Sequence, residues 1–127
     1  TPPWKRCSSI TLELLVELGY TGLSRNRGKA APIPGGFPDF PVSVDLHTRK
    51  EKNAVKAFET LFSELRAGLA EGLCGIMIHH QRMNDSAFEF LDILLQELSP
   101  HPGVKLVDFK NLIETYIRSG PKEARSW

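Results

Sequence analysis

The run Gly75-Ile76-Met77-Ile78-His79-His80 constrains the fold most, because it is apolar and ends abruptly in two histidines. A short apolar run without polar alternation is typical of a buried strand in an α/β sheet. Ligands bind at the carboxyl ends of such strands, where His79 and His80 stand. Neighbouring strand residues point to opposite faces, so we expect at most one of them to face a single pocket. The alternative, in which one imidazole caps a backbone carbonyl and the other is solvated, stays open.

Helices and strands alternate along the rest of the chain. Apolar residues at helical spacing predict four helices. The first contains Ile10, Leu14, Leu15 and Leu18, between a cap at Ser8 or Ser9 and a stop at Gly19, and the second covers 55–69 and ends at Gly72. The third runs from 84–86 to Leu98, with Ser86 and Glu89 at capping-box spacing, and the fourth is marked by Leu112, Ile113, Tyr116 and Ile117. Further strands are expected at 20–24, 42–47 and 104–107. This order predicts an α/β fold with four mostly parallel strands, as an open sheet or as part of a barrel. We expect one domain over 1–118 and a polar tail over 119–127.

A long loop is expected between Arg25 and Pro41, because glycines and prolines fill its second half. Its basic residues Arg25, Arg27 and Lys29 are interpreted as solvated surface, with an anion site as the alternative.

The composition excludes some classes of partner. A net charge of +1 over 127 residues gives no electrostatic reason to bind nucleic acid or an anionic membrane. No apolar run approaches the ~20 residues of a membrane span, and no signal-peptide pattern opens the chain. Cys7 and Cys74 are predicted to be free thiols, with a single bridge as the alternative. These features favour the cytoplasm.

Polar side chains alternate with apolar ones in the segment Val44-Asp45-Leu46-His47. Asp45 and His47 share one face of the predicted strand, where their side chains could share a proton or bind one substrate. A half-exposed edge strand would give the same pattern without any chemistry.

Several of these segments resemble the C-terminal half of a polysaccharide deacetylase of the NodB-homology family of carbohydrate esterases. Thr1-Pro2-Pro3-Trp4 resembles the family's third motif, and Leu18-Gly19-Tyr20 with Leu23-Ser24 resembles the segment after it. The run Ile76-Met77-Ile78-His79 resembles the fifth motif, a strand end whose histidine is the general acid. Asp45 could stand for the acidic residue of the fourth motif.

The resemblance implies half of a NodB-like (β/α)7 barrel and a hydrolase of carbohydrate metabolism that acts on carbon–nitrogen bonds other than peptide bonds. A divalent metal ion, with zinc favoured, would polarise the amide carbonyl of an N-acetyl sugar and activate water. The catalytic residues would be His79 as acid, Trp4 through its N–H at the oxyanion, and Asp45. His80, His47 and Met77 would bind substrate, and His80 is the second candidate for the acid.

The chain also departs from the family pattern. Thr1 stands where the third motif usually has arginine, and the motifs that hold the catalytic base and the metal ligands would precede Thr1. The histidines at 47, 79, 80 and 101 show no ligand spacing, so we expect the metal ligands to lie outside this chain. It would then be a fragment, active only when complemented.

The expected partners follow from this interpretation. They are a carbohydrate substrate and either the missing N-terminal half or a second copy of the chain, because half of a barrel leaves open strand edges. The alternative is a non-catalytic sugar-binding or scaffolding α/β domain related to the same family.

Overall fold

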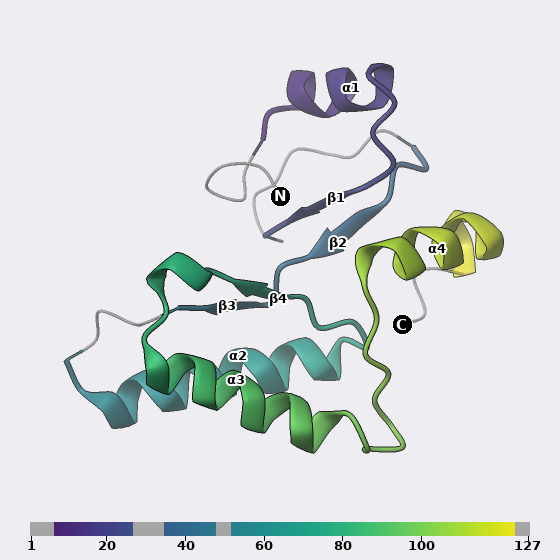
Figure 1. Cartoon of the computed structure of the whole chain (residues 1–127). Helices are drawn as coiled ribbons and strands as arrows, with labels where there is room; N and C mark the ends of the chain where they lie inside the picture. The colour runs from purple at the N-terminus through teal and green to yellow at the C-terminus, as the bar shows by residue number, and fades with distance from the viewer. Residues whose placement is uncertain (1–6, 27–34, 48–51, 124–127) are drawn as a thin grey trace.

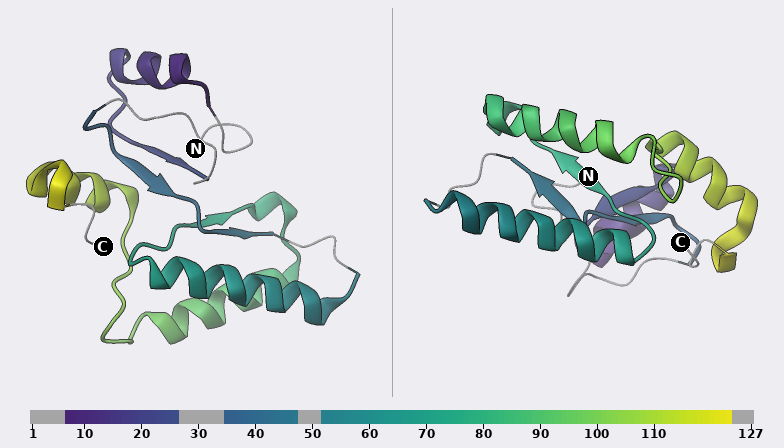
Figure 2. Two further views of the ribbon diagram at one scale, coloured as in Figure 1. Left: turned by 180° about the vertical axis from the view of Figure 1, so that it is seen from behind. Right: turned by 90° about the horizontal axis from the view of Figure 1, so that it is seen from below.

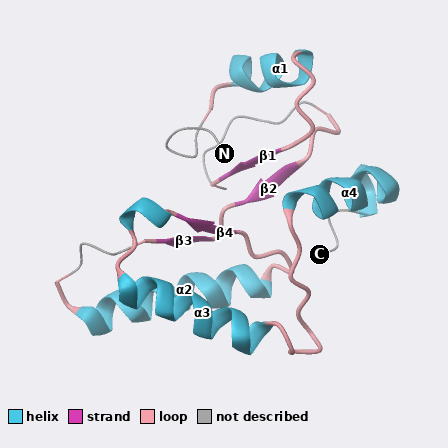
Figure 3. Cartoon of the chain, viewed as in Figure 1, coloured by secondary structure: helices cyan, strands magenta, loops and turns pink. Residues whose placement is uncertain are grey.

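A computed structural model describes residues 7–26, 35–47 and 52–123, with side chains as far as Arg118 (Figure 1). Its elements are α1 (Ser9–Glu17), β1 (Leu23–Arg25), β2 (Asp39–Pro41), β3 (Val44–Leu46), α2 (Ala54–Ala70), β4 (Ile76–Ile78), the 3₁₀ helix η2 (His80–Arg82), α3 (Asp85–Leu98) and α4 (Phe109–Glu123). Figure 3 shows the mixture of helices and strands that the sequence predicts, so the chain is an α/β protein.

The four strands form two small sheets, and both pairings are parallel. β1 pairs with β2 from Leu23 opposite Asp39, and β3 pairs with β4 from Val44 opposite Ile76. The parallel pairing predicted from the order of elements is therefore confirmed. The described residues form no closed barrel.

Helices α2 and α3 lie side by side and cover one face of the β3–β4 sheet (Figure 2). The main core lies at this contact: Val44 and Leu46 of β3 pack against Leu61 and Leu65 of α2, and all four are at most 6% exposed. Burial of each such side chain contributes roughly 1.5–3 kcal/mol, which fixes the position of β3 against α2.

Helices α1 and α4 lie near the β1–β2 sheet (Figures 1 and 2). The ring of Phe40 in β2 makes edge contacts with Phe109 and Tyr116 of α4, at centroid distances of 5.9 and 6.3 Å. In α1 the fully buried residue is Leu12. The predicted apolar stripe of this helix is wrong in part, because Ile10, Leu14 and Leu18 are 66%, 49% and 73% exposed.

Polar side chains cap the starts of the helices. Ser8, one of the two predicted caps of α1, accepts a hydrogen bond from the Thr11 N–H. Helix α3 begins after Asn84, whose side chain accepts from the Ala87 N–H, so the predicted cap at Ser86 is two residues late. The predicted stops of α1 and α2, Gly19 and Gly72, both have positive φ.

The predicted loop from Arg25 to Pro41 contains structure at both of its ends. Arg25 belongs to β1, and Asp39–Pro41 form β2. Arg25 is only 3% exposed, and its Nε donates to Oδ2 of Asp39 over 3.1 Å. The interpretation of Arg25 as solvated surface is therefore wrong, because its side chain is buried and pairs with the partly buried carboxylate of Asp39. Arg27 and Lys29 lie outside the described residues.

The segment 104–107 is not a strand, contrary to the prediction. A strand needs a hydrogen-bonded neighbour, and among the described residues β4 pairs with β3 alone. Leu106 and Val107 remain 50% and 39% exposed. Helix α4 continues to Glu123, so it enters the predicted polar tail. None of the described helices has the length and apolar character needed to cross a membrane.

Candidate functional site

Three residues that the sequence singled out share one face of the β3–β4 sheet. Asp45 is the register partner of Met77, and the His79 N–H donates to the Leu46 carbonyl over 3.1 Å, which continues the pairing beyond β4. Because side chains alternate along a strand, Asp45, Met77 and His79 project from the face opposite Leu46 and the core. Helices α2 and α3 lie on the other face of this sheet (Figures 1 and 2).

Asp45 and His79 are in direct contact. Nε2 of His79 lies 2.7 Å from Oδ1 of Asp45. The side chain of His79 is 31% exposed and that of Asp45 is 25% exposed. The ring of His47 lies edge-on to that of His79, with a centroid distance of 5.7 Å. We call these three residues the Asp45–His79–His47 cluster. It lies at the carboxyl ends of two parallel strands, where ligands bind in α/β sheets.

A local irregularity precedes the cluster. The backbone N–H groups of Ser43 and Val44 both donate to the carbonyl of Gly75, over 2.8 and 3.0 Å. Two residues of one strand thus oppose one residue of the other, as in a β-bulge. A bulge shifts the alternation of side chains that follow it. After the bulge the alternation of β3 is regular, with Val44 in the core and Asp45 on the opposite face.

Gly75 allows the close approach of the chains at this bulge. A Cβ atom at this position would collide with the carbonyl oxygen of Pro41. Only glycine therefore lets the chain just before β4 approach the end of β2 this closely. The position of His79 depends on this approach, because His79 lies four residues further along the same strand direction.

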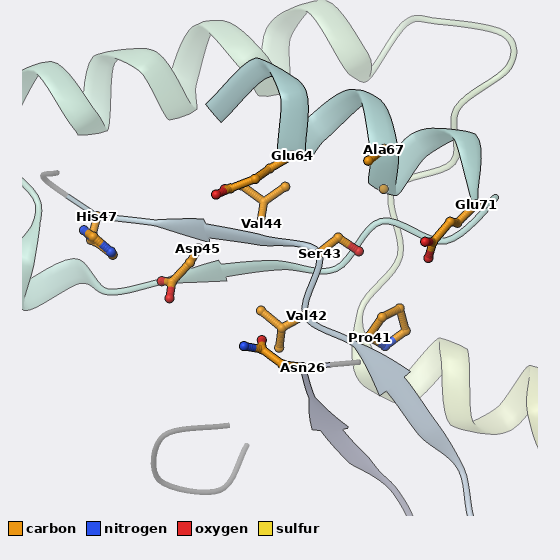
Figure 4. A pocket seen from close by; sticks show the side chains of 11 residues that line it. Asn26, Pro41, Val42, Ser43, Val44, Asp45, His47, Glu64, Ala67 and Glu71 are labelled. Carbon is orange, nitrogen blue, oxygen red and sulfur yellow. The ribbon is translucent and has the colours of Figure 1, made fainter. Parts of the chain in front are cut away.

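A cavity of about 500 Å³ runs beside β3 and includes part of the cluster. Figure 4 shows Asp45 and His47 on the β3 side of this cavity, Glu64 on α2 and Glu71 at the C-cap of α2. Asn26 lines it at the end of β1. Carboxylate, amide and imidazole groups around an open cavity offer the hydrogen-bonding partners that a sugar needs.

The remaining predicted site residues are placed as follows. His80 is exposed and opens η2, so it does not join the cluster. Trp4 lies outside the described residues. In the described part of the chain, no group of three or more His, Cys, Asp or Glu residues could hold a metal ion. The cluster therefore does not fit a resident metal, and the expectation of ligands outside the chain stays a prediction.

Cys74 lies beside the bulge and is a free thiol, like Cys7, as predicted. Burial raises the pKa of the Cys74 thiol, the Ser43 side chain lowers it by hydrogen bonding, and the charge of Glu71 raises it again. The net shift is upward, which keeps the thiol protonated and unreactive at neutral pH.

Sequence reasoning missed the parts of the site that support the cluster. Ser43 and Gly75 build the bulge, and Glu64 lines the cavity from α2. A glycine directly before an apolar strand was a usable signal, because it often marks a close backbone approach. Nothing in the sequence distinguishes Glu64 from Glu59, the other acidic residue of α2.

No family model, curated protein or solved structure matches the chain.

Proposed function

We propose that this chain is the C-terminal half of a NodB-type polysaccharide deacetylase domain and supplies the leaving-group side of amide hydrolysis on an N-acetyl sugar. The contact between Asp45 and His79 carries the proposal. The resemblance assigns these two residues to different motifs, the fourth and the fifth. The distance of 2.7 Å between their side chains was not used to assign them to these motifs, so it is a separate observation.

The geometry suits His79 as a general acid. In amide hydrolysis the amine leaves only after its nitrogen gains a proton. Asp45 lies against Nε2 of His79, so its carboxylate orients the ring and stabilises the imidazolium form. The second ring nitrogen, Nδ1, then transfers the proton to the leaving nitrogen. In this proposal His47 limits the space beside the ring and helps to orient the sugar.

The metal and the catalytic base belong to the complementing half in this proposal. The described residues form no metal site, so no step of this mechanism is assigned to a metal held by this chain. Trp4 keeps its proposed role at the oxyanion, which the described residues do not test.

Open strand edges support the idea that the chain has a partner. The large cavity touches the consecutive residues 41–45, and another of about 380 Å³ touches the consecutive residues 73–78. Because consecutive residues point to both faces, cavities that touch all of them run along strand edges. Among the described residues, β3 and β4 pair only with each other. Further strands, from an N-terminal half or a second copy, would satisfy both edges.

The test is the release of acetate from a chitin oligosaccharide by the complemented protein. His79→Ala should lower kcat by roughly 10²- to 10⁴-fold, the usual contribution of general acid catalysis. His101→Ala is the matched control, because His101 is exposed and its Nδ1 accepts only a local hydrogen bond from Gly103 in the structure described. This control should retain full activity.

Binding of the same oligosaccharide separates the enzyme from the non-catalytic alternative. For the enzyme, His79→Ala should leave the affinity within a few-fold of the parent. If the complemented protein binds the sugar but releases no acetate in either form, the chain is a sugar-binding domain and the catalytic proposal is wrong.

A further inference from the structure

One side of α2 carries a stripe of exposed side chains. At about 3.6 residues per turn, five exposed residues fall within about a quarter of the helix circumference. They are Val55, Phe58, Phe62, Arg66 and Leu69, and we call them the α2 stripe. The four apolar members are each at least 45% exposed. Large apolar side chains gathered on one exposed face usually mark a contact with other protein.

Aromatic contacts hold the centre of the α2 stripe in place. The rings of Phe58 and Phe62 stack, with centroids 6.5 Å apart and an interplanar angle of 30°. Both rings also contact Phe90 of α3, at centroid distances of 6.1 and 6.0 Å. The stripe thus lies toward α3, which runs beside α2 (Figures 1 and 2). Rings held by their neighbours lose little conformational freedom when a partner covers them.

The α2 stripe and the large cavity lie on different sides of the helix. Glu64, which lines the large cavity, is roughly 160° around the helix from Phe62 at the centre of the stripe. A partner bound to the stripe would therefore leave this cavity open.

The order of residues in the α2 stripe is symmetric about Phe62. Successive members are three, four, four and three residues apart. When a second α2 lies antiparallel to the first, with the two Phe62 residues side by side, Val55 of one copy lies opposite Leu69 of the other. Phe58 then lies opposite Arg66, where a guanidinium can stack on the ring. A surface that contacts itself across a two-fold axis must be self-complementary in this way.

The charges beside the α2 stripe are also complementary under this two-fold axis. Glu59 and Arg66 are both exposed and lie seven residues, or about two turns, apart on the same flank of the stripe. In the antiparallel arrangement, Glu59 of each copy lies beside Arg66 of the other, and the axis creates two pairs of opposite charge. The charges of the stripe thus complement those of the same stripe, which identifies a second copy of the chain as its partner.

We propose that the α2 stripe is the interface of an antiparallel homodimer, in which Phe62 of the two copies meet at the two-fold axis and Glu59 of each copy pairs with Arg66 of the other. This inference goes beyond the proposed function and does not depend on it. The contact is also separate from the strand edges of β3 and β4. Because each copy contributes one helix of 17 residues, the interface is small and the dimer is weak. It forms at the high protein concentrations used for NMR.

Methyl NOEs test the proposal in the full chain. Within one copy, Val55 and Leu69 are 14 residues apart, which is about 21 Å along the helix and beyond the reach of an NOE. In the dimer they lie side by side across the interface. An isotope-filtered NOESY spectrum of ¹³C-labelled chain mixed with unlabelled chain should therefore contain cross-peaks between Val55 and Leu69.

Charge reversal tests the register of the two copies. Glu59→Arg places like charges opposite each other, so it should abolish the Val55–Leu69 cross-peaks and raise the Kd of the dimer roughly tenfold or more, measured from the dilution dependence of α2 amide shifts. Arg66→Glu should have the same effect. An equimolar mixture of the two variants restores both pairs of opposite charge, so the cross-peaks should return. Glu13→Arg is the matched control, because Glu13 is exposed on α1 and the change in charge is the same, and it should keep the Kd of the parent chain.

Two results would overturn the inference. If the parent chain shows no Val55–Leu69 cross-peaks at NMR concentration, the α2 stripe does not bind a second copy. If the cross-peaks persist unchanged in Glu59→Arg, the charges do not select the antiparallel partner. Neither result bears on acetate release by the complemented protein, so the proposed function stands or fails separately.

Discussion

His79 reaches diagonally across the β3–β4 sheet to Asp45, with 2.7 Å between Nε2 and Oδ1, and the ring of His47 lies edge-on beside it. Asp45 is directly opposite Met77 in the parallel register. The contact thus depends on the register of β3 against β4, which is not visible in either segment alone.

Removal of the carboxylate should release the ring of His79. In Asp45→Ala, we expect the neutral imidazole to lose its preference for the tautomer with the proton on Nε2, because the carboxylate oxygen 2.7 Å from Nε2 is gone. Ring ¹⁵N shifts of His79 report the tautomer directly, and His101 in the same spectra is the internal reference. In the complemented protein, kcat should fall by about 10²-fold or more. Unchanged ¹⁵N shifts of His79 would contradict the role given to Asp45.

Gly75 should tolerate no side chain. We expect Gly75→Ala to lower the free energy of unfolding by about 2 kcal/mol or more, because its Cβ would collide with the carbonyl of Pro41. Gly35→Ala is the control, since a Cβ there meets nothing within 4 Å, and it should change stability by less than about 0.5 kcal/mol. Urea denaturation of both variants measures the difference. Equal stabilities would show that β4 can move without cost.

The helices were predictable because their signals are local. The apolar periodicity of α2 and α3, the cap at Ser8 and the stop at Gly72 all act within a few residues along the chain. The pairs that define the sheets join distant residues, so the sequence concealed them. Thus β2 was hidden in a loop rich in glycine and proline. The segment 104–107 has the composition of a strand, but the described residues offer it no hydrogen-bonded neighbour.

The candidate site was predictable as a set of residues and not as an arrangement. Asp45, His47 and His79 stand out because strand ends in parallel sheets carry function. Their mutual contacts follow from a register that neither segment encodes by itself. His80 shows the limit most clearly, because the sequence alone could not decide which of the two adjacent histidines would contact Asp45.

The partly buried ion pair between Arg25 and Asp39, whose side chains are 3% and 17% exposed, should be costly to break. Asp39→Ala leaves the guanidinium of Arg25, which is 3% exposed, without its carboxylate. Removal of one partner of a buried pair typically costs about 3–5 kcal/mol, and we expect a loss in that range in thermal or urea unfolding. The double variant Arg25→Leu with Asp39→Leu should recover part of this loss, because no buried charge remains. Full stability in Asp39→Ala would show that solvent reaches Arg25.

Cys74 should react slowly with alkylating agents at neutral pH. Burial raises the pKa of its thiol, so the folded chain holds less thiolate at pH 7–8 than the unfolded chain does. We expect alkylation of Cys74 by iodoacetamide to accelerate several-fold in urea at constant pH. Because the folded state binds this proton more tightly, stability should also fall as the pH rises through the ordinary thiol range. Peptide mapping by mass spectrometry separates Cys74 from Cys7, and equal rates in both states would contradict the burial of this thiol.

Exposed apolar side chains should give the isolated chain a strong tendency to associate. Ile10 of α1, Leu18 at its C-cap and Val55 of α2 are each at least 66% exposed, and the cavities beside β3 and β4 follow strand edges. Such surfaces usually mark contacts with other protein. We expect the chain to bind 8-anilinonaphthalene-1-sulfonate and to sediment as a dimer or larger species at micromolar concentration. Addition of a complementing N-terminal half should abolish both effects. A monodisperse monomer that binds no dye would show that the described surfaces need no partner, and the half-domain interpretation would then be wrong.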